Sequence, residues 1–399
     1  MSTSLLVHID QPISRPSHWG GVLAMTLCVF ALIASEFMPV SLLTPLAADL
    51  HVSEGVAGQG IAISGAFAVL TSLSITWLAG SMDRKTLLLI LTSLMAISVT
   101  VVALAPSFAI YMVGRALIGV VIGGFWSISA ATAMRLVPDD QVPKALAIFN
   151  GGNALATVIA APLGSYLGSV VGWRGAFLCL VPVAVVALVW QCLSLPSMKA
   201  QVRKRPAGNV FRLLGTRSVA FGMTACGAFF MGQFALFTYL RPFLETVTQV
   251  DTATLSLLLL VIGSAGLGGT LFIGPLLKKN LYRTLVAIPL LMAVIAITLI
   301  PAGGAVASVA ILLGLWGMMA TAAPVGWWSW LAQAMPNDAE AGGGLMVAVV
   351  QFAIASGSML GGWLFDHSGY QSSFTASAAL LLFGMVMTLL AMRAQSDRR

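Results

Sequence analysis

Glu36 and Arg115 are charged residues that lie well inside long apolar segments of a chain in which only 8% of the residues are charged. An ionised side chain is costly inside a lipid bilayer, so such a residue is a candidate functional site with a partner to be found. Burial and a neighbouring cation act in opposite directions on the pKa of a carboxyl group. Glu36 therefore has the chemistry of a proton carrier. Arg115 keeps its proton at physiological pH and would modulate the carboxyl group.

The spacing of these two residues predicts that their side chains meet. Counted from Trp19, Glu36 lies about 25 Å along a helix that rises about 1.5 Å per residue. Arg115 lies about 10 Å from the outer end of its own segment by the same rise. Both depths fall in the outer half of a bilayer, which favours a proton-coupling pair. The alternative is an ion pair that only holds helices together.

The composition excludes a soluble protein and indicates that lipid surrounds the chain. Of the 399 residues 59% are hydrophobic, and the mean hydropathy is +0.97, whereas soluble domains carry roughly 25% charged residues. The net charge of +7 comes from Lys and Arg in short connections, a pattern typical of cytoplasmic loops and not of a nucleic-acid site. The four cysteines and four histidines have no metal-ligand or disulfide spacing, so we expect no metal site.

Twelve apolar runs are long enough to cross a bilayer, because a spanning helix needs about 20 residues. Continuous runs of this length are helices, since the strands of a membrane barrel alternate over segments of about ten residues. We therefore predict an all-α membrane protein. The predicted spans are 19–46, 55–79, 86–105, 108–136, 143–170, 174–195, 218–244, 252–277, 284–302, 305–333, 342–366 and 371–392.

The distribution of Lys and Arg predicts that both termini lie in the cytoplasm. With the N-terminus inside, 17 of the 20 basic residues fall in cytoplasmic connections or tails, which is the bias seen in membrane proteins. An even number of spans then returns the C-terminus to the same side. The first eighteen residues lack a cleavage site of small residues and are interpreted as a cytoplasmic tail.

The chain is predicted to consist of two halves. A basic connection at 196–217 separates an N-terminal six-helix bundle, 1–195, from a C-terminal six-helix bundle, 218–399. The sequence GGFWSISAATAMRLVPDD at 123–140 is similar to VGWWSWLAQAMPNDAE at 325–340, an offset near 200 residues. Weak symmetry between two halves is typical of secondary transporters, whose substrate site lies near the bilayer midplane between the halves.

Short motifs in the first half contain residues that fit a gating role. Asp83 and Arg84 stand in a charged turn, AGSMDRKTL, between the second and third spans; a plain charged turn is the alternative interpretation. Gly152, Pro162 and Gly164 lie in the fifth span, where small residues let helices approach closely and a proline bends one of them.

These motifs, together with the glycines that follow Arg115, resemble those of the major facilitator superfamily. Longer stretches, among them EFMPVSLLTPLAADLHVSEGVAGQ and APVGWWSW, resemble the exporters of purine ribonucleosides within its drug:proton antiporter group, along essentially the whole chain. The resemblance implies twelve helices in two pseudo-symmetric bundles, a place in the bacterial inner membrane, and export of nucleosides such as inosine and guanosine in exchange for protons. Export of sugars, or of drugs and other amphipathic compounds, is the alternative. The motifs are imperfect, since Ile118 and Ala161 stand where the family has other residues.

A pocket for a neutral, flat nucleoside needs aromatic faces and amide or hydroxyl groups, and no fixed charge. Several such side chains are predicted near the middle of their spans. Alternatively, a Trp at a span end anchors the helix at the interface, and a buried amide bridges helices. The candidate substrate-binding residues are Trp126, Asn150, Asn153, Gln233, Phe237, Gln351 and Trp328.

Other classes of protein fit the sequence less well. An enzyme would need a nucleophile with its base, or metal ligands, within the spans, and Glu36 with Arg115 is the only intramembrane ionisable pair. A primary pump would need a phosphate-binding G-x-x-x-x-G-K-[ST] loop, which the chain lacks. We therefore expect a monomeric transporter, not an enzyme, with no cofactor beyond the proton as coupling ion. Its expected partners are a small-molecule substrate and the bilayer, with no nucleic acid.

Overall fold

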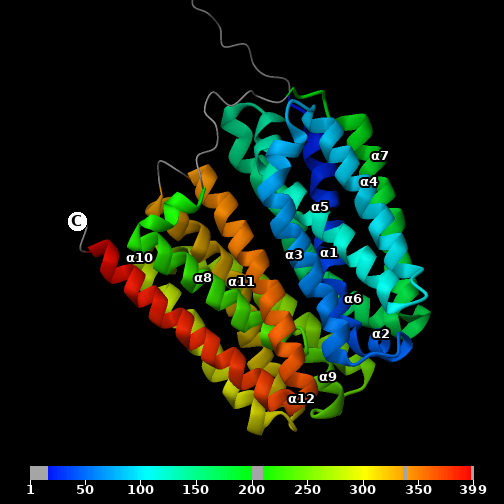
Figure 1. The fold of residues 1–399 in the computed structure, drawn as a ribbon, viewed down its shortest axis with the longest axis vertical. Helices are drawn as coiled ribbons and strands as arrows, with labels where there is room; N and C mark the ends of the chain where they lie inside the picture. The colour runs from blue at the N-terminus through cyan, green and yellow to red at the C-terminus, as the bar shows by residue number, and fades with distance from the viewer. Residues whose placement is uncertain (1–16, 200–209, 336–338, 397–399) are drawn as a thin grey trace, which may run out of the picture.

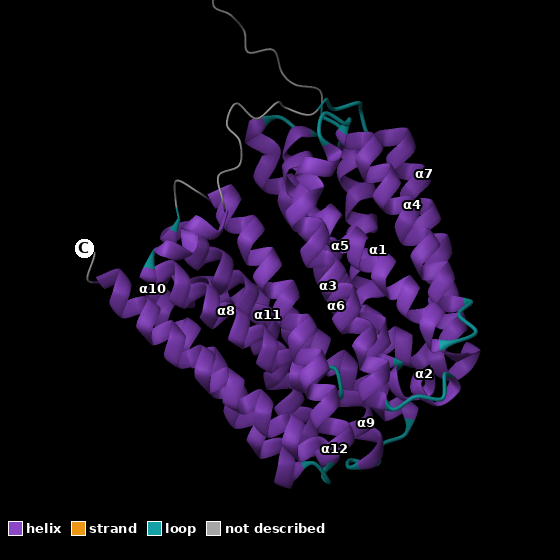
Figure 2. Ribbon diagram, viewed as in Figure 1, coloured by secondary structure: helices purple, strands orange, loops and turns teal. Residues whose placement is uncertain are grey.

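A computed structural model describes residues 17–199, 210–335 and 339–396. Within these ranges every regular element is a helix, and the connections are short and lie at the two ends of the molecule (Figure 2). Nine of the described helices are long and apolar enough to cross a membrane. The helical backbone satisfies its own hydrogen bonds, which is the requirement that lipid imposes on a spanning segment.

The first half of the chain forms seven α-helices and one short 3₁₀ turn, η1. Proline at the second position of α6 is tolerated, because its missing N–H would have had no partner inside the helix. The elements are α1 (Trp19–Ser41), α2 (Leu43–Asp49), α3 (Glu54–Ala79), α4 (Arg84–Ala103), α5 (Phe108–Arg135), η1 (Asp139–Gln141), α6 (Val142–Leu178) and α7 (Leu180–Ser194).

The second half has fewer but longer helices. Its longest helical segment, α12, has 58 residues in two limbs that meet at Gly369, far more than one crossing of a bilayer requires. The elements are η2 (Val210–Gly215), α8 (Arg217–Phe237), α9 (Leu240–Thr246), α10 (Thr252–Ala302), α11 (Val306–Ala334) and α12 (Ala339–Ser396).

Three of the nine long apolar segments contain a reversal and therefore count as two spans each. Gly172, at φ 74°, ends the first limb of α6, and Gly369, at φ 77°, divides α12. Asn280, with non-helical angles of φ −161° and ψ 93°, divides α10. A positive φ favours glycine, since it has no Cβ to clash. Nine segments and three extra limbs give twelve spans, as the sequence predicts.

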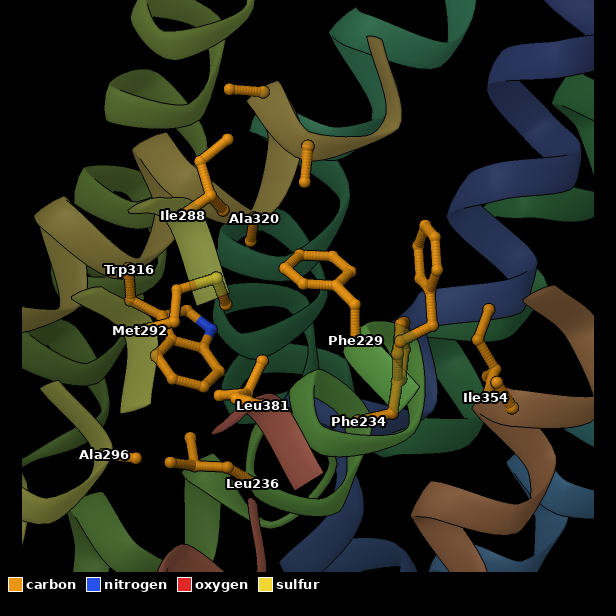
Figure 3. Close-up of a cluster of buried hydrophobic side chains, with 14 of the residues drawn as sticks. Phe229, Phe234, Leu236, Ile288, Met292, Ala296, Trp316, Ala320, Ile354 and Leu381 are labelled. Atoms are coloured by element: carbon orange, nitrogen blue, oxygen red, sulfur yellow. The ribbon is translucent and has the colours of Figure 1, made fainter. Parts of the chain in front are cut away.

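The helices form two groups that lean against each other (Figure 1). One group contains α1 to α7 and the other α8 to α12, and the contacts between them run mainly along α3 with α12 and α6 with α10. The second group has its own apolar core, with Phe229, Trp316 and Leu381 packed together (Figure 3). The proposed limits of the two bundles and of the connection at 196–217 stay a prediction.

Candidate functional site

The site is a cavity of about 440 Å³ between the two groups of helices. Helices α1, α5 and α6 line it from the first group, and α8, α10, α11 and α12 from the second. Its volume falls within the range of small-molecule sites, ~300–1,000 Å³. Seven of the residues singled out from the sequence line it: Glu36, Trp126, Asn150, Asn153, Gln233, Gln351 and Trp328.

Among the described residues that line the cavity, Glu36 is the only acidic or basic one. It lies on α1 and is only 3% exposed. Gln351 of α12 is the side-chain hydrogen-bond partner of its carboxyl group. The acid of the first half therefore meets an amide of the second half at the cavity wall.

Arg115 does not line the cavity; it lies behind Glu36 and is 1% exposed. Its guanidinium donates to backbone carbonyls of Ser35 (2.8 Å), Glu36 (3.1 Å) and Gly60 (3.0 Å), and to the Ser64 hydroxyl (3.1 Å). The ion pair expected between the guanidinium and the Glu36 carboxyl group is not formed. The two residues are neighbours, but Arg115 holds the backbone of α1 instead of its acid.

Pro39 explains why Arg115 binds the backbone. Proline has no N–H, so within α1 the carbonyl four residues earlier, that of Ser35, loses its helical partner. A buried carbonyl without a partner is costly, and the guanidinium of Arg115 supplies the missing donor. The sequence contains this signal, since a proline four residues after Ser35 predicts a free carbonyl beside Glu36.

Two amide oxygens in the cavity wall are free to accept a hydrogen bond. Oε1 of Gln233 and Oε1 of Gln351 are buried and have no partner among the described residues. Asn150 differs, because its amide donates to the Leu146 carbonyl of its own helix (2.9 Å). A buried polar atom without a partner is unfavourable, so the two glutamine oxygens favour a ligand that donates hydrogen bonds.

Aromatic rings line both sides of the cavity. Trp126 packs edge-on against Phe149, with ring centroids 6.2 Å apart, and Phe37 stacks on Phe234 across the two groups of helices at 5.7 Å. Trp328 is 49% exposed, so its ring is open to a ligand. Such faces suit a flat aromatic ligand.

Phe237 is the one predicted substrate residue that does not line the cavity. It is the last residue of α8 and packs edge-on against Phe234, with ring centroids 5.9 Å apart. A position four residues along from Gln233 would share its face in a regular helix, but the cavity ends before this turn. Phe37 lines the cavity and was missed from the sequence, although it directly follows Glu36.

The residues predicted to act in gating lie at helix contacts. A Cβ on Gly152 would overlap the Thr26 carbonyl of α1, and one on Gly164 would lie 2.7 Å from the Ser41 hydroxyl. Pro162 lies inside α6. These contacts place the backbones of α1 and α6 close together, and the gating role itself stays a prediction.

Asp83 and Arg84 connect the turn before α4 to the segment after α7. Asp83 caps α4 by accepting from the Lys85 N–H (2.8 Å), and it also accepts from the Ser197 hydroxyl (2.6 Å). Partial burial opposes ionisation, but these hydrogen bonds outweigh it and keep the pKa of the Asp83 carboxyl group below its usual value. The Arg84 N–H donates to the Met198 carbonyl (2.9 Å).

The cavity is closed at the end of the molecule where α2 and α9 lie. Asp366 of α12 accepts from the Ser53 hydroxyl and from the Gly55 N–H (3.0 Å) at the start of α3. Tyr239 donates to the Gly55 carbonyl (3.4 Å), and Arg241 donates to the last carbonyl of α1. Toward the other end, where α7 finishes and α8 begins, the two groups diverge (Figure 1).

Helices and cavity together define a membrane transporter, and the chain belongs to the Major Facilitator Superfamily, whose family model matches residues 25–355. It is an all-α, multi-pass membrane protein with twelve spans in two six-helix bundles. Members of this family carry small molecules across a bilayer, so the predicted class of protein is confirmed.

Two relatives with different names are similar in sequence to this protein over nearly the whole chain. A protein of Pseudomonas aeruginosa named transcription regulatory protein OpdE is 62% identical over 399 residues, covering 99% of each chain. The purine ribonucleoside efflux pump NepI of Salmonella paratyphi B is 40% identical over 370 residues, covering 93% of each chain. The resemblance that the sequence motifs indicate is thus confirmed.

Two solved structures share the fold. A bacterial homolog of the human lysosomal transporter Spinster, in an inward-facing and unoccupied conformation, has a TM-score of 0.80 at 16% identity, covering 97% of this chain and 99% of that one. The human organic anion transporter MFSD10 has a TM-score of 0.66 at 18% identity, covering 94% and 100%.

Proposed function

We propose that the protein exports purine ribonucleosides, such as inosine and guanosine, in exchange for protons. The observation that carries this proposal is the cavity between the two bundles, which has one acid, Glu36, in a wall of amides and aromatic rings. The name of the Salmonella relative, a purine ribonucleoside efflux pump, points to the same class of substrate. The transport cycle would be alternating access, with the two bundles rocking about the cavity.

The substrate side of the proposal depends on uncharged groups. A purine nucleoside has ring N–H and ribose O–H donors, and the buried oxygens of Gln233 and Gln351 have no donor among the residues that the structure describes. Its flat ring would stack on Trp126 or Trp328, which face the cavity. Hydrogen bonds of this kind add selectivity, because an analogue without the donor leaves a buried oxygen unpaired.

The proton side of the proposal depends on Glu36. The carboxyl group is buried at the cavity wall and is hydrogen-bonded across the bundle interface to Gln351. A carboxyl group at that interface would take up or release a proton when the cavity opens to the other side of the membrane. Arg115 would act as a positioning residue, because it holds the backbone on which Glu36 stands. No other cofactor is proposed.

We propose the bacterial inner membrane as the location, with both termini in the cytoplasm and the protein acting as a monomer. The bias of Lys and Arg supports this orientation, and it would make the present cavity open to the cytoplasm. An exporter that lowers the concentration of an effector in the cell changes transcription without touching DNA. That route reconciles the proposal with the name of the Pseudomonas relative.

The test uses inverted membrane vesicles and radiolabelled inosine. An imposed proton gradient, acidic inside, should drive uptake in vesicles that contain the wild-type protein, and a protonophore should abolish it. Uptake without any response to the gradient would reject proton coupling. If inosine and guanosine are not transported at all while a sugar or an amphipathic drug is, the alternative substrate class replaces nucleosides.

A further inference from the structure

The second group of helices has an apolar groove on its outer surface, away from the transport cavity. Both limbs of α10 and part of α11 line this groove, which has a volume of about 490 Å³. Phe272 is 77% exposed, and Leu276 and Leu291 at the rim are also exposed. In a spanning helix such side chains face the acyl chains of the bilayer, since lipid is the surrounding solvent.

One end of the groove is basic. Lys279 and Arg283 line it where α10 reverses at Asn280, and neither side chain has a hydrogen bond or an ion pair among the described residues. No acidic residue lines the groove, and the sequence has no Asp or Glu between Asp251 and Asp338. Among the described residues, no acidic side chain pairs with the positive charge at this end.

The matching turn in the first half is different. Asp83 caps α4, and Asn280 caps the second limb of α10 by accepting from the Arg283 N–H (3.0 Å). The two capping residues stand 197 positions apart. In the first half, the capping group beside Arg84 and Lys85 is a carboxylate. In the second half, the capping group beside Lys279 and Arg283 is a neutral amide.

We infer that this groove binds a phospholipid with an anionic headgroup from the surrounding bilayer. The phosphate lies between Lys279 and Arg283, and an acyl chain lies along α10 and α11 over Ile273 and Ile288. Basic pockets at the ends of membrane helices bind anionic headgroups for the same reason. The groove supplies both parts that the lipid needs, a dry apolar channel and two cations at its mouth.

The experiment measures lipid retained by the purified, full-length protein in native mass spectrometry. The protein is titrated with dioleoylphosphatidylglycerol and with dioleoylphosphatidylcholine, which differ in headgroup charge. A surface cation contributes ~1 kcal/mol to binding an anionic lipid, about 5-fold in affinity, so a double variant should lose about 30-fold. We expect K279Q/R283Q to show this loss for phosphatidylglycerol and little change for phosphatidylcholine.

A matched control separates the groove from net charge. R212Q/R217Q removes two exposed cations near the start of α8 and should retain phosphatidylglycerol like the wild type. Ala287→Phe fills the groove at an exposed position without changing charge, and should lower retention of phosphatidylglycerol. Equal loss in the control variant, or equal retention of both lipids by the wild type, would overturn the inference. The measurement does not depend on transport, so it holds or fails separately from the proposed function.

Discussion

The two halves of the molecule contribute different chemistry to the same cavity. The first half brings Glu36 and, behind it, Arg115, whereas none of the cavity-lining residues of the second half is acidic or basic. The second half brings Gln233 and Gln351, whose amide oxygens have no hydrogen-bond partner in the described part of the chain. Under the proposed function, this division separates proton coupling in the first bundle from much of substrate recognition in the second. The two meet where Gln351 faces Glu36.

Replacing Glu36 should have the largest effect, because it removes the only titratable group among the described residues of the cavity wall. Glu36→Gln keeps shape and hydrogen bonding but cannot exchange a proton. Gradient-driven uptake of inosine in inverted vesicles should be abolished, while exchange of labelled for unlabelled inosine without a gradient continues. Glu54→Gln, an acid at the start of α3 away from the cavity, is the control. Concentrative uptake by Glu36→Gln would show that the first half does not hold the proton site.

Replacing the amides should weaken substrate binding, and changes at Gln233 and Asn153, which do not bond Glu36, should do so without loss of proton coupling. Gln233→Ala, Gln351→Ala and Asn153→Ala each remove a partner worth about 1–3 kcal/mol, which is about 5- to 150-fold in affinity. Competition of unlabelled inosine for labelled inosine measures the change. Phe237→Ala, outside the cavity on the same helix as Gln233, should change affinity less than about 2-fold. A drug site built on apolar surface would tolerate the amide changes and respond mainly to Trp126→Ala.

Arg115 and Pro39 should be energetically coupled. Arg115→Ala leaves the Ser35 carbonyl without a donor, at a cost of about 1–3 kcal/mol. In a Pro39→Ala background the helix restores that hydrogen bond, so the same change should cost about 1 kcal/mol less. Thermal unfolding of the four proteins in one detergent gives the coupling. Additive effects would mean that Arg115 acts on Glu36 through charge and not through the backbone of α1.

The smallest effect is expected from an acid of the first half at the surface. Arg174 hydrogen-bonds Asp49 and keeps the pKa of that carboxyl group below its usual value. Such a group stabilises the fold above its unfolded pKa, about 3.9, and the contribution disappears as the pH falls through the lower folded value. Both side chains are partly exposed, so Asp49→Asn should lower the free energy of unfolding by less than about 1 kcal/mol at neutral pH. The difference from wild type in thermal unfolding should disappear in strong acid or high salt.

The twelve spans and most of the cavity residues were predictable, because length and apolar composition decide what crosses a bilayer. Six of the seven substrate candidates line the cavity, because a polar side chain in the middle of a span needs a polar environment within the protein. The helix face that points toward the other bundle was not predictable. Phe237 is an example, because it was predicted to bind substrate and does not line the cavity. In a helix that is apolar on every side, the sequence has no hydrophobic periodicity that identifies the face packed against the other bundle.

The partner of Arg115 was also not predicted, for a different reason. Opposite charges at similar depth predicted a side-chain pair, whereas the fold uses the cation to repair the backbone near Pro39. The groove at Lys279 could not be found either, because it exists only when both limbs of α10 and α11 are packed. The local sequence indicates charge, depth and, through Pro39, an open Ser35 carbonyl, but it does not indicate which donor reaches that carbonyl.

The two glycine reversals have a consequence for the origin of the molecule. Gly172 and Gly369 have nearly the same φ, 74° and 77°, and stand 197 positions apart, the same interval that separates Asp83 from Asn280. Matched turns at one interval are what gene duplication of a six-span ancestor leaves behind. Because six is even, the second copy enters the membrane in the same orientation as the first. A fused gene of this kind therefore needs no added span and no change in the distribution of Lys and Arg between the two sides. Each copy can then lose side chains that the other copy retains.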